Sequence, residues 1–340
     1  MIHSRHGCPP AVCGKTTAPL LNGDFPMPTP DPPELPRPKR DHRLSVPEGR
    51  VSFDLTLGRN RVRLLDLPTL WEPFVEERYA PFAEAVSATQ RPSLTITCKE
   101  IPANTLIPLP PPGGITVLDL ERLGPGSYQI RSHWQEGWID LRRGEGELVL
   151  SSRVWDRFAM SLENFLRVTL QLLSLESESF LLHTAAVLEK GACHFFFGPS
   201  GAGKSTATAF SLPRPALSDD MVLVDLSRAT PCARAVPFFM VYPPEKRLRG
   251  SFPIRGAFRL RQDSTDFLER LELARAVATI SASVPFVHEL GLSHVGLTEL
   301  VVKLCNAAPV FDLHFTRSAR FWKLIDALPQ TLWASGSSQK

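Results

Sequence analysis

The chain has 340 residues, a hydrophobic content of 43% and a formal net charge of +3. This length and composition predict one large domain or two modest ones with a substantial core. The low net charge and the lack of a long Lys/Arg block argue against nucleic acid or an acidic membrane surface as a main partner.

Three features bear on where the protein works. No apolar run reaches the ~20 residues that a membrane span needs. The His and Arg residues near the N-terminus are not followed by the apolar segment of a secretory signal. The six cysteines are scattered without a disulfide framework. We therefore expect a soluble, cytoplasmic protein.

Residues 1–42 hold 10 of the 32 prolines and show little apolar periodicity, which predicts a disordered tail. Two histidines and two cysteines in this tail fit no usual zinc spacing, so we expect no metal there. They are His3, His6, Cys8 and Cys13. Residues 331–340 are expected to be a flexible C-terminus.

Residues 43–150 are predicted to form a β-rich α+β region without a catalytic constellation. A helix is expected over 71–86, and the prolines of 104–114 predict a loop. Partial alternation of apolar and polar residues indicates strands. These lie at 50–58, 61–67, 93–101, 126–133 and 137–143.

Residues 152–175 have apolar positions at helical spacing and predict one long helix. The stretch FLLHTAAVLEKGACHFFFG that follows predicts a β-hairpin with a three-residue loop at 189–191. Pairing outward from that loop sets Leu188 against Ala192 and His183 against Phe197. We therefore expect the imidazole of His183 at the mouth of the glycine-rich motif that comes next.

The segment GPSGAGKST, residues 198–206, matches the pattern of a P-loop. Its glycines allow several N–H groups to approach a polyphosphate, and the helix expected after it directs its N-terminal dipole at the same anion. Lys204 can reach the β- and γ-phosphates, and the Ser205 hydroxyl can ligate Mg²⁺. The predicted ATP-binding residues are Gly198, Ser200, Gly201, Ala202, Gly203, Lys204, Ser205 and Thr206.

Two adjacent carboxylates follow in ALSDDMVLVD, after a helix that we expect Pro213 and Pro215 to keep short. In common P-loop ATPases the acidic residue comes after an apolar run, whereas Asp219 and Asp220 precede theirs. Adjacent side chains on a strand point to opposite faces, so the two groups either serve different partners or converge through a bulge.

Together, LLHTAAV, the hairpin, GPSGAGKST and LSDD resemble the HPr kinase/phosphorylase superfamily, and more closely its HPr-kinase-like serine kinases. The likeness is strongest over about residues 180–226 and extends weakly to about 328. It implies a phosphoenolpyruvate carboxykinase-like P-loop kinase domain, here over 151–330, and hence an α/β (α+β overall) fold. Members of the family often assemble, which is consistent with a homo-oligomer.

The resemblance also implies roles for individual residues. Asp219 would be the general base, and Asp220 would support that base or, together with Ser205, the metal. His183 would lie beside that carboxylate and tune it. Pro199 departs from HPr kinase, which has an acidic residue after the first loop glycine. Its acidic, Arg-Gly-rich signature is also missing, and Glu245 is only a weak stand-in.

A basic segment, residues 245–262, follows the aspartates and predicts either groups that stabilise a transferring phosphoryl group or a solvated loop and strand. Its cationic residues are Lys246, Arg247, Arg249, Arg255, Arg259 and Arg261. Further on, a helix is expected over 294–307, a strand over 309–315 and a closing helix over 319–328.

These features predict a kinase that uses ATP and Mg²⁺ to phosphorylate a serine-like hydroxyl on a small molecule, a peptide or a protein. A catalytically silent ATP-binding regulatory module is the main alternative. A transporter-type ATPase is disfavoured because no LSGGQ-like signature and no apolar run ending in Asp-Glu is present. The position of the aspartates does not suit guanylate-kinase-like chemistry.

Overall fold

The structure, a computed structural model, describes residues 49–101, 106–109, 118–151, 155–239, 247–287 and 294–329. For 155–160 and 294–295 it describes the backbone alone. Several sequence-based predictions lie outside the described residues. These are the proline-rich tail with His3, His6, Cys8 and Cys13, most of the loop 104–114, Lys246, the C-terminal residues 331–340, and Glu245.

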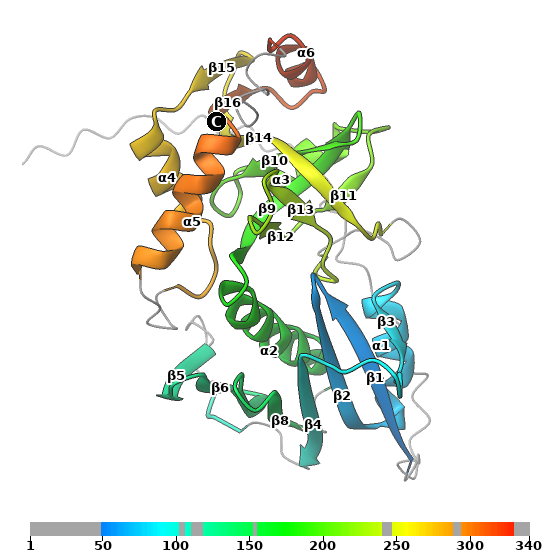
Figure 1. The fold of residues 1–340 in the computed structure, drawn as a ribbon. Helices are drawn as coiled ribbons and strands as arrows, with labels where there is room; N and C mark the ends of the chain where they lie inside the picture. The colour runs from blue at the N-terminus through cyan, green and yellow to red at the C-terminus, as the bar shows by residue number, and fades with distance from the viewer. Residues whose placement is uncertain are drawn as a thin grey trace, which may run out of the picture. The chain divides into compact units, whose positions relative to one another are not determined.

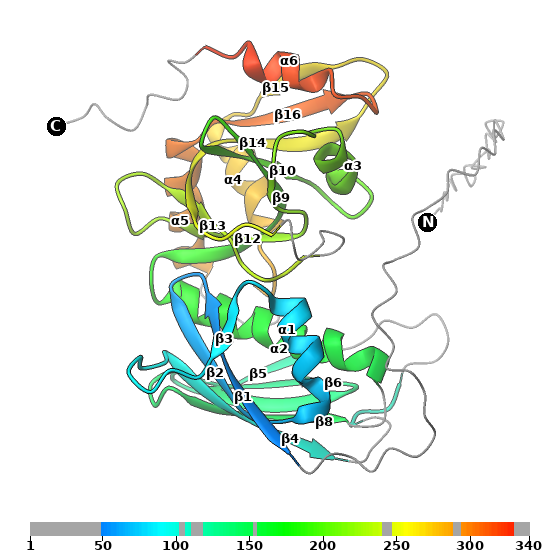
Figure 2. The ribbon, with the colours of Figure 1, turned by 90° about the vertical axis from the view of Figure 1, so that its right-hand side faces the viewer.

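The first sheet contains eight strands within the described ranges, in the order β3-β1-β2-β4-β8-β7-β6-β5 (Figure 2). Strand β4 runs parallel to β2 and to β8, and the other neighbours are antiparallel. The strands are β1 (Arg50–Leu57), β2 (Asn60–Pro68), β3 (Ala83–Ala85), β4 (Leu94–Ile101), β5 (Leu118–Gly124), β6 (Ser127–Ser132), β7 (Gln135–Asp140) and β8 (Glu145–Ser151).

Two α-helices cover the core of this sheet. A 3-10 turn, η1 (Thr69–Trp71), leads into α1 (Glu72–Tyr79), and α2 (Trp155–Leu175) crosses from this sheet to β9 of the next. The helix predicted over 71–86 is wrong beyond Tyr79, because Pro81 cannot continue a helix and the chain then enters β3. The long helix predicted over 152–175 is confirmed by α2 over its described part.

The second sheet is also mixed, and part of it closes on itself. Its main path is β10-β9-β12-β13-β14-β16-β15, and β10 additionally pairs parallel to β14, so five strands form a closed ring of pairings (Figure 1). The strands are β9 (Ser179–Glu189), β10 (Ala192–Phe197), β11 (Ala216–Ser218), β12 (Met221–Asp225), β13 (Cys232–Arg234), β14 (Ser251–Gln262), β15 (Phe267–Arg270) and β16 (Val310–Phe315).

Both faces of strand β10 are buried, which explains its run of three phenylalanines. Phe195 and Phe197 pack into a core with α4 (Leu273–Ser281) and α5 (His294–Ala307). Phe196 points the other way, into a core with α3 (Lys204–Ala209) and α6 (Phe321–Asp326). Alternate residues of a strand point to opposite faces, so a strand between two layers of helices needs apolar residues on both faces.

The described residues therefore form a mixed α/β structure, α+β overall, with two large mixed sheets and few helices. None of these helices has the length and apolar character needed to cross a bilayer, among the residues that the structure describes.

Candidate functional site

The glycine loop, residues 198–206, connects the end of β10 to the first turn of α3. Gly198 has φ +150° and Gly203 has φ +105°, both in a region that side chains rarely adopt. A Cβ at Gly198 would lie 2.9 Å from the Cβ of Ala202, and one at Gly203 would lie 3.0 Å from Cζ of Phe315. The loop is thus tight at both ends, and this compact backbone is what a phosphate cradle needs.

Lys204 opens α3, and its ammonium group folds back over the loop. Nζ donates to the carbonyl oxygens of Gly198 at 3.0 Å and Pro199 at 3.4 Å. Burial lowers the pKa of Lys204, and the negative charge of Asp220 offsets part of that fall. An anionic ligand could replace these carbonyl contacts with its own oxygens, which accept more strongly from a cation.

The other predicted phosphate-binding residues differ in their exposure and surroundings. Ser205 is exposed in the first turn of α3, and Thr206 beside it is half-buried. Ser200, Gly201 and Ala202 line an adjoining cavity. The side-chain amide of Gln262, on β14, donates to the carbonyl oxygen of Gly201 at 2.9 Å and ties the middle of the loop to the sheet.

Asp219 and Asp220 lie in a turn between β11 and β12, and each is 5% exposed. The Ser218 hydroxyl accepts from the backbone N–H groups of Asp220 at 3.1 Å and Met221 at 3.0 Å. The carbonyl oxygen of Asp220 accepts from the N–H of Thr184 at 2.9 Å. The Thr184 bond holds the turn against β9, and β11 and β12 pair with β9 on either side of it.

The predicted register of the β9–β10 hairpin is wrong by one residue. Ala192 pairs with Glu189, so Phe197 lies opposite Thr184 and not opposite His183. The cause is the turn, which has two residues and not three. Lys190 and Gly191 both have positive φ, +50° and +75°, as a two-residue turn suited to the twist of a hairpin requires.

His183 still reaches the site, but by a different route. It pairs with Met221 on β12, and this places its ring beside the aspartate turn. Nε2 lies 3.3 Å from Oδ1 of Asp220, and the imidazole lines the cavity next to the glycine loop. The neighbouring carboxylate is thus Asp220, the residue that follows the candidate base Asp219.

The environment of His183 favours its neutral form. Its side chain is 43% exposed, whereas that of Asp220 is 7% exposed. Burial lowers the pKa of His183, Asp220 opposes this, and the charges of Lys204 and Arg167 lower it further. A neutral imidazole that faces an open cavity and has a buried carboxylate behind it is able to accept a proton.

A chain of buried charges extends from Asp220 into the helices of the first sheet. Arg167, on α2, donates to Oδ2 of Asp220 at 2.6 Å and also contacts Glu163 on the same helix. Glu163 in turn accepts from Arg78, which lies on α1. Sequence reasoning missed these three residues because the pattern around them indicated only a helix.

Asp219 faces different partners. Its charge acts on Arg78 and Arg247, the second of which lies in the predicted basic segment. Burial lowers the pKa of Arg247 to about 10, and Asp219 is among the acidic groups that oppose this fall. The two adjacent carboxylates are therefore not equivalent, because Asp220 lies 3.3 Å from the imidazole of His183 and the charge of Asp219 acts on Arg78 and Arg247.

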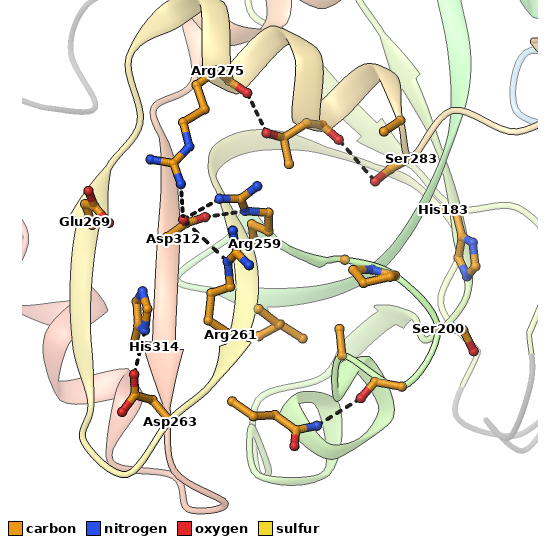
Figure 3. A pocket seen from close by; sticks show the side chains of 18 residues that line it. His183, Ser200, Arg259, Arg261, Asp263, Glu269, Arg275, Ser283, Asp312 and His314 are labelled. Atoms are coloured by element: carbon orange, nitrogen blue, oxygen red, sulfur yellow. Dashed lines mark hydrogen bonds and ion pairs between the residues drawn. The ribbon is translucent and has the colours of Figure 1, made fainter. Parts of the chain in front are cut away.

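The cavity beside the loop has a volume of about 930 Å³ (Figure 3). Its walls come from the glycine loop, β14, β15, β16, α4 and His183. Three arginines meet at one carboxylate in this wall, and Figure 3 shows them on the side away from His183. They are Arg259, Arg261 and Arg275, around Asp312.

The residues at the loop offer the oxygen donors that Mg²⁺ prefers, which are the exposed hydroxyl of Ser205 and the carboxylates of the aspartate turn. Mg²⁺ in such sites takes most of its other ligands from phosphates and water. One cluster of possible metal ligands occurs among the described residues, formed by Glu269, Asp312 and His314. Three arginines already surround Asp312, so this cluster does not suit a cation.

No protein-family model matches the sequence, and a search of curated proteins finds no match to it.

Proposed function

We propose that the protein is an ATP-dependent kinase that transfers the γ-phosphoryl group to a serine-like hydroxyl on a small molecule, a peptide or a protein. We also propose that its fold and chemistry are of the HPr-kinase-like type, with a phosphoenolpyruvate carboxykinase-like P-loop domain. The observation that carries the proposal is that the glycine loop and His183 line one open cavity, with Asp220 at 3.3 Å from the imidazole and the charge of Lys204 acting on it.

In this proposal the glycine loop binds the phosphates of ATP. Its backbone N–H groups surround the β- and γ-phosphates, and Lys204 exchanges the carbonyl oxygens of Gly198 and Pro199 for phosphate oxygens. Ser205 and a carboxylate of the aspartate turn would hold Mg²⁺, which neutralises charge on the phosphates. Lys204 then stabilises the charge that builds up during transfer.

His183 is the group best placed to take the proton of the acceptor hydroxyl. Its Nε2 faces Asp220, which leaves Nδ1 as the proton acceptor. The hydroxyl oxygen bonds to the γ-phosphorus as the bond to the bridging β,γ-oxygen breaks, so that ADP leaves. Asp220 orients the imidazole and stabilises its charged form. Asp219 is the base that the family resemblance implies, so the two aspartates need separate tests.

The test is transfer of labelled γ-phosphate from ATP to a panel of hydroxyl compounds and serine peptides, with release of phosphate to water measured alongside. His183→Gln and Asp220→Asn should each reduce the rate by about 100-fold or more, since a positioned general base contributes about that much. Asp326→Asn, on α6 and outside the cavity wall, is the matched control and should leave the rate unchanged.

The outcomes separate the alternatives. A large loss in Asp219→Asn with full activity in His183→Gln would reassign the base to Asp219. Tight ATP binding without any transfer, to the panel or to water, would favour the catalytically silent regulatory module.

A further inference from the structure

The arginine cluster consists of Arg259, Arg261 and Arg275 around Asp312, and its three members contact that carboxylate differently. Arg259 forms a bidentate ion pair with both oxygens of Asp312. Nε of Arg261 lies 3.6 Å from Oδ2 and Nη2 of Arg275 lies 3.4 Å from the same atom, so both are held more loosely. Arg259 thus neutralises the charge of Asp312, and Arg261 and Arg275 keep N–H donors that are available to another acceptor.

The fold explains how these side chains meet. Arg259 on β14 pairs directly with Asp312 on β16, and Asp312 pairs on its other side with Glu269 on β15. Arg261 lies two residues along β14, on the same face of the strand as Arg259. Arg275 comes from the helix α4. Separate elements therefore place three cations at one buried carboxylate.

The guanidinium donors of the cluster are only partly used. Three guanidinium groups share the single carboxylate of Asp312, which engages only part of their N–H donors. The side chains of Arg261 and Arg275 are 45% and 54% exposed, and both line the cavity. Each guanidinium carries five N–H donors in a planar fork, which matches a carboxylate or a phosphate group.

The nearby acidic groups do not occupy these donors. Nδ1 of His314 lies 2.8 Å from Oδ2 of Asp263, and the same carboxylate accepts from the backbone N–H of Ser264. Asp312 is 1% exposed and already meets three cations. The cavity wall therefore offers unused guanidinium donors from Arg261 and Arg275, beside the exposed carboxylate of Glu269.

We propose that Arg261 and Arg275 bind an anionic group, a carboxylate or a phosphate, on the phosphoryl acceptor. His183 and the arginine cluster lie on opposite sides of the cavity in Figure 3, with the glycine loop between them. An acceptor can thus place its hydroxyl at His183 and its anionic group at the cluster. The assignment to the acceptor rests on the proposed kinase function, whereas the anion site itself does not.

The experiment uses the full chain saturated with Mg²⁺ and a non-hydrolysable ATP analogue, so that the glycine loop is filled. Calorimetric titration at constant ionic strength then measures binding of inorganic phosphate in one arm and succinate in the other. Arg261→Gln and Arg275→Gln should each raise the Kd of the bound probe by about tenfold, the loss expected for one charge-assisted contact. The arm that binds identifies the anion.

Two controls sharpen the result. Arg270→Gln changes an exposed arginine on β15 outside the cavity wall. It should leave the Kd of the probe and the Kd of the analogue unchanged. The analogue should bind wild type, Arg261→Gln and Arg275→Gln with equal Kd.

The inference is overturned if neither phosphate nor succinate binds the protein loaded with the analogue, or if Arg261→Gln and Arg275→Gln leave the Kd of the bound probe unchanged. It is also overturned if the analogue and the probe compete for binding. If the analogue fails to bind wild type, the proposed kinase function fails instead. The same titrations on nucleotide-free Lys204→Ala protein, in which the loop cation is removed, then still test the anion site.

Discussion

At the scale of single residues, the proposed phosphoryl transfer depends on the protonation state of His183. Its pKa lies below the ordinary value near 6.5, because burial and the charges of Lys204 and Arg167 outweigh the attraction of Asp220. The imidazole is therefore neutral at pH 7 and ready to accept a proton. Protonation at lower pH blocks that step, so the loss of activity is expected on the acid side.

We predict that the transfer rate is level between pH 8 and pH 7 and falls only below about pH 6.5. Asp220→Asn removes the charge that raises the pKa of His183. The acid limb of its residual activity should therefore lie at a lower pH than that of wild type. Rates measured from pH 5 to pH 8 for both proteins check this. An acid limb at or above pH 7 would show that His183 does not control the reaction.

His194 supplies a second titration, which affects stability and not catalysis. It is 3% exposed between the rings of Phe258 and Trp322, and burial, with smaller contributions from Arg255 and Arg214, lowers its pKa to about 3. The unfolded chain binds this proton near pH 6.5 and the folded chain does not. Stability from this group is complete above pH 6.5 and is lost as the pH falls toward 3.

The expected loss from His194 is about 1.4 kcal/mol of unfolding free energy per pH unit below about pH 6.5. Urea unfolding of wild type and His194→Gln at pH 7, 6 and 5 isolates the effect, because other titrating groups contribute equally to both proteins. The variant should be less stable at pH 7 and less sensitive to pH. Parallel curves for the two proteins would contradict the assignment.

At the scale of elements, the β9–β10 hairpin positions both His183 and the strand that enters the glycine loop. Its turn depends on Gly191, whose φ is +75°, and a Cβ added there would meet no atom within 4 Å. The cost of a side chain at this position is therefore conformational and not steric. A one-residue change in register would turn each strand residue to the other face.

Gly191→Ala should lower the free energy of unfolding by about 1–2 kcal/mol, the penalty for a left-handed backbone with a side chain. Gly296→Ala is the matched control. It lies in helix α5, again with no atom within 4 Å of an added Cβ, and should raise stability by about 0.5–1 kcal/mol. Denaturant unfolding measures both, and a shift of the same sign in the two variants would refute this account of the turn.

At the scale of the whole molecule, buried charges link the helices of the first sheet to the aspartate turn. Glu163 is 6% exposed and lies between Arg78 and Arg167, at 2.5 Å from each. Arg167 continues the chain of contacts to Asp220. Removal of the charge on Glu163 leaves two poorly solvated cations without their shared partner.

Glu163→Gln should therefore lower the free energy of unfolding by about 3–5 kcal/mol. Glu147→Gln removes a carboxylate that pairs with the exposed Lys99, and its cost should stay within about 1 kcal/mol. Thermal and urea unfolding of the two variants provide the comparison. Similar small losses in both would mean that the buried contacts add nothing beyond a surface pair.

Sequence reasoning succeeded where the relevant residues are adjacent in the chain. The glycine loop follows a buried strand and opens a helix, and Asp219 and Asp220 lie together at a strand start, all as local pattern predicts. It failed where the outcome depends on three-dimensional pairing. The turn at Lys190 shifted the register, and Arg167 and Arg275 come from helices whose pattern carries no sign of what they contact.

The most direct test of the central claim is to measure binding of Mg²⁺-ATP to the full chain by titration calorimetry. Wild type is predicted to bind ATP, and Lys204→Ala to bind it at least about 10-fold more weakly, because a charge-assisted contact to phosphate is lost. Arg270→Gln should bind like wild type. Absence of binding by wild type, or equal Kd values for wild type and Lys204→Ala, would contradict the assignment of the glycine loop as an ATP site.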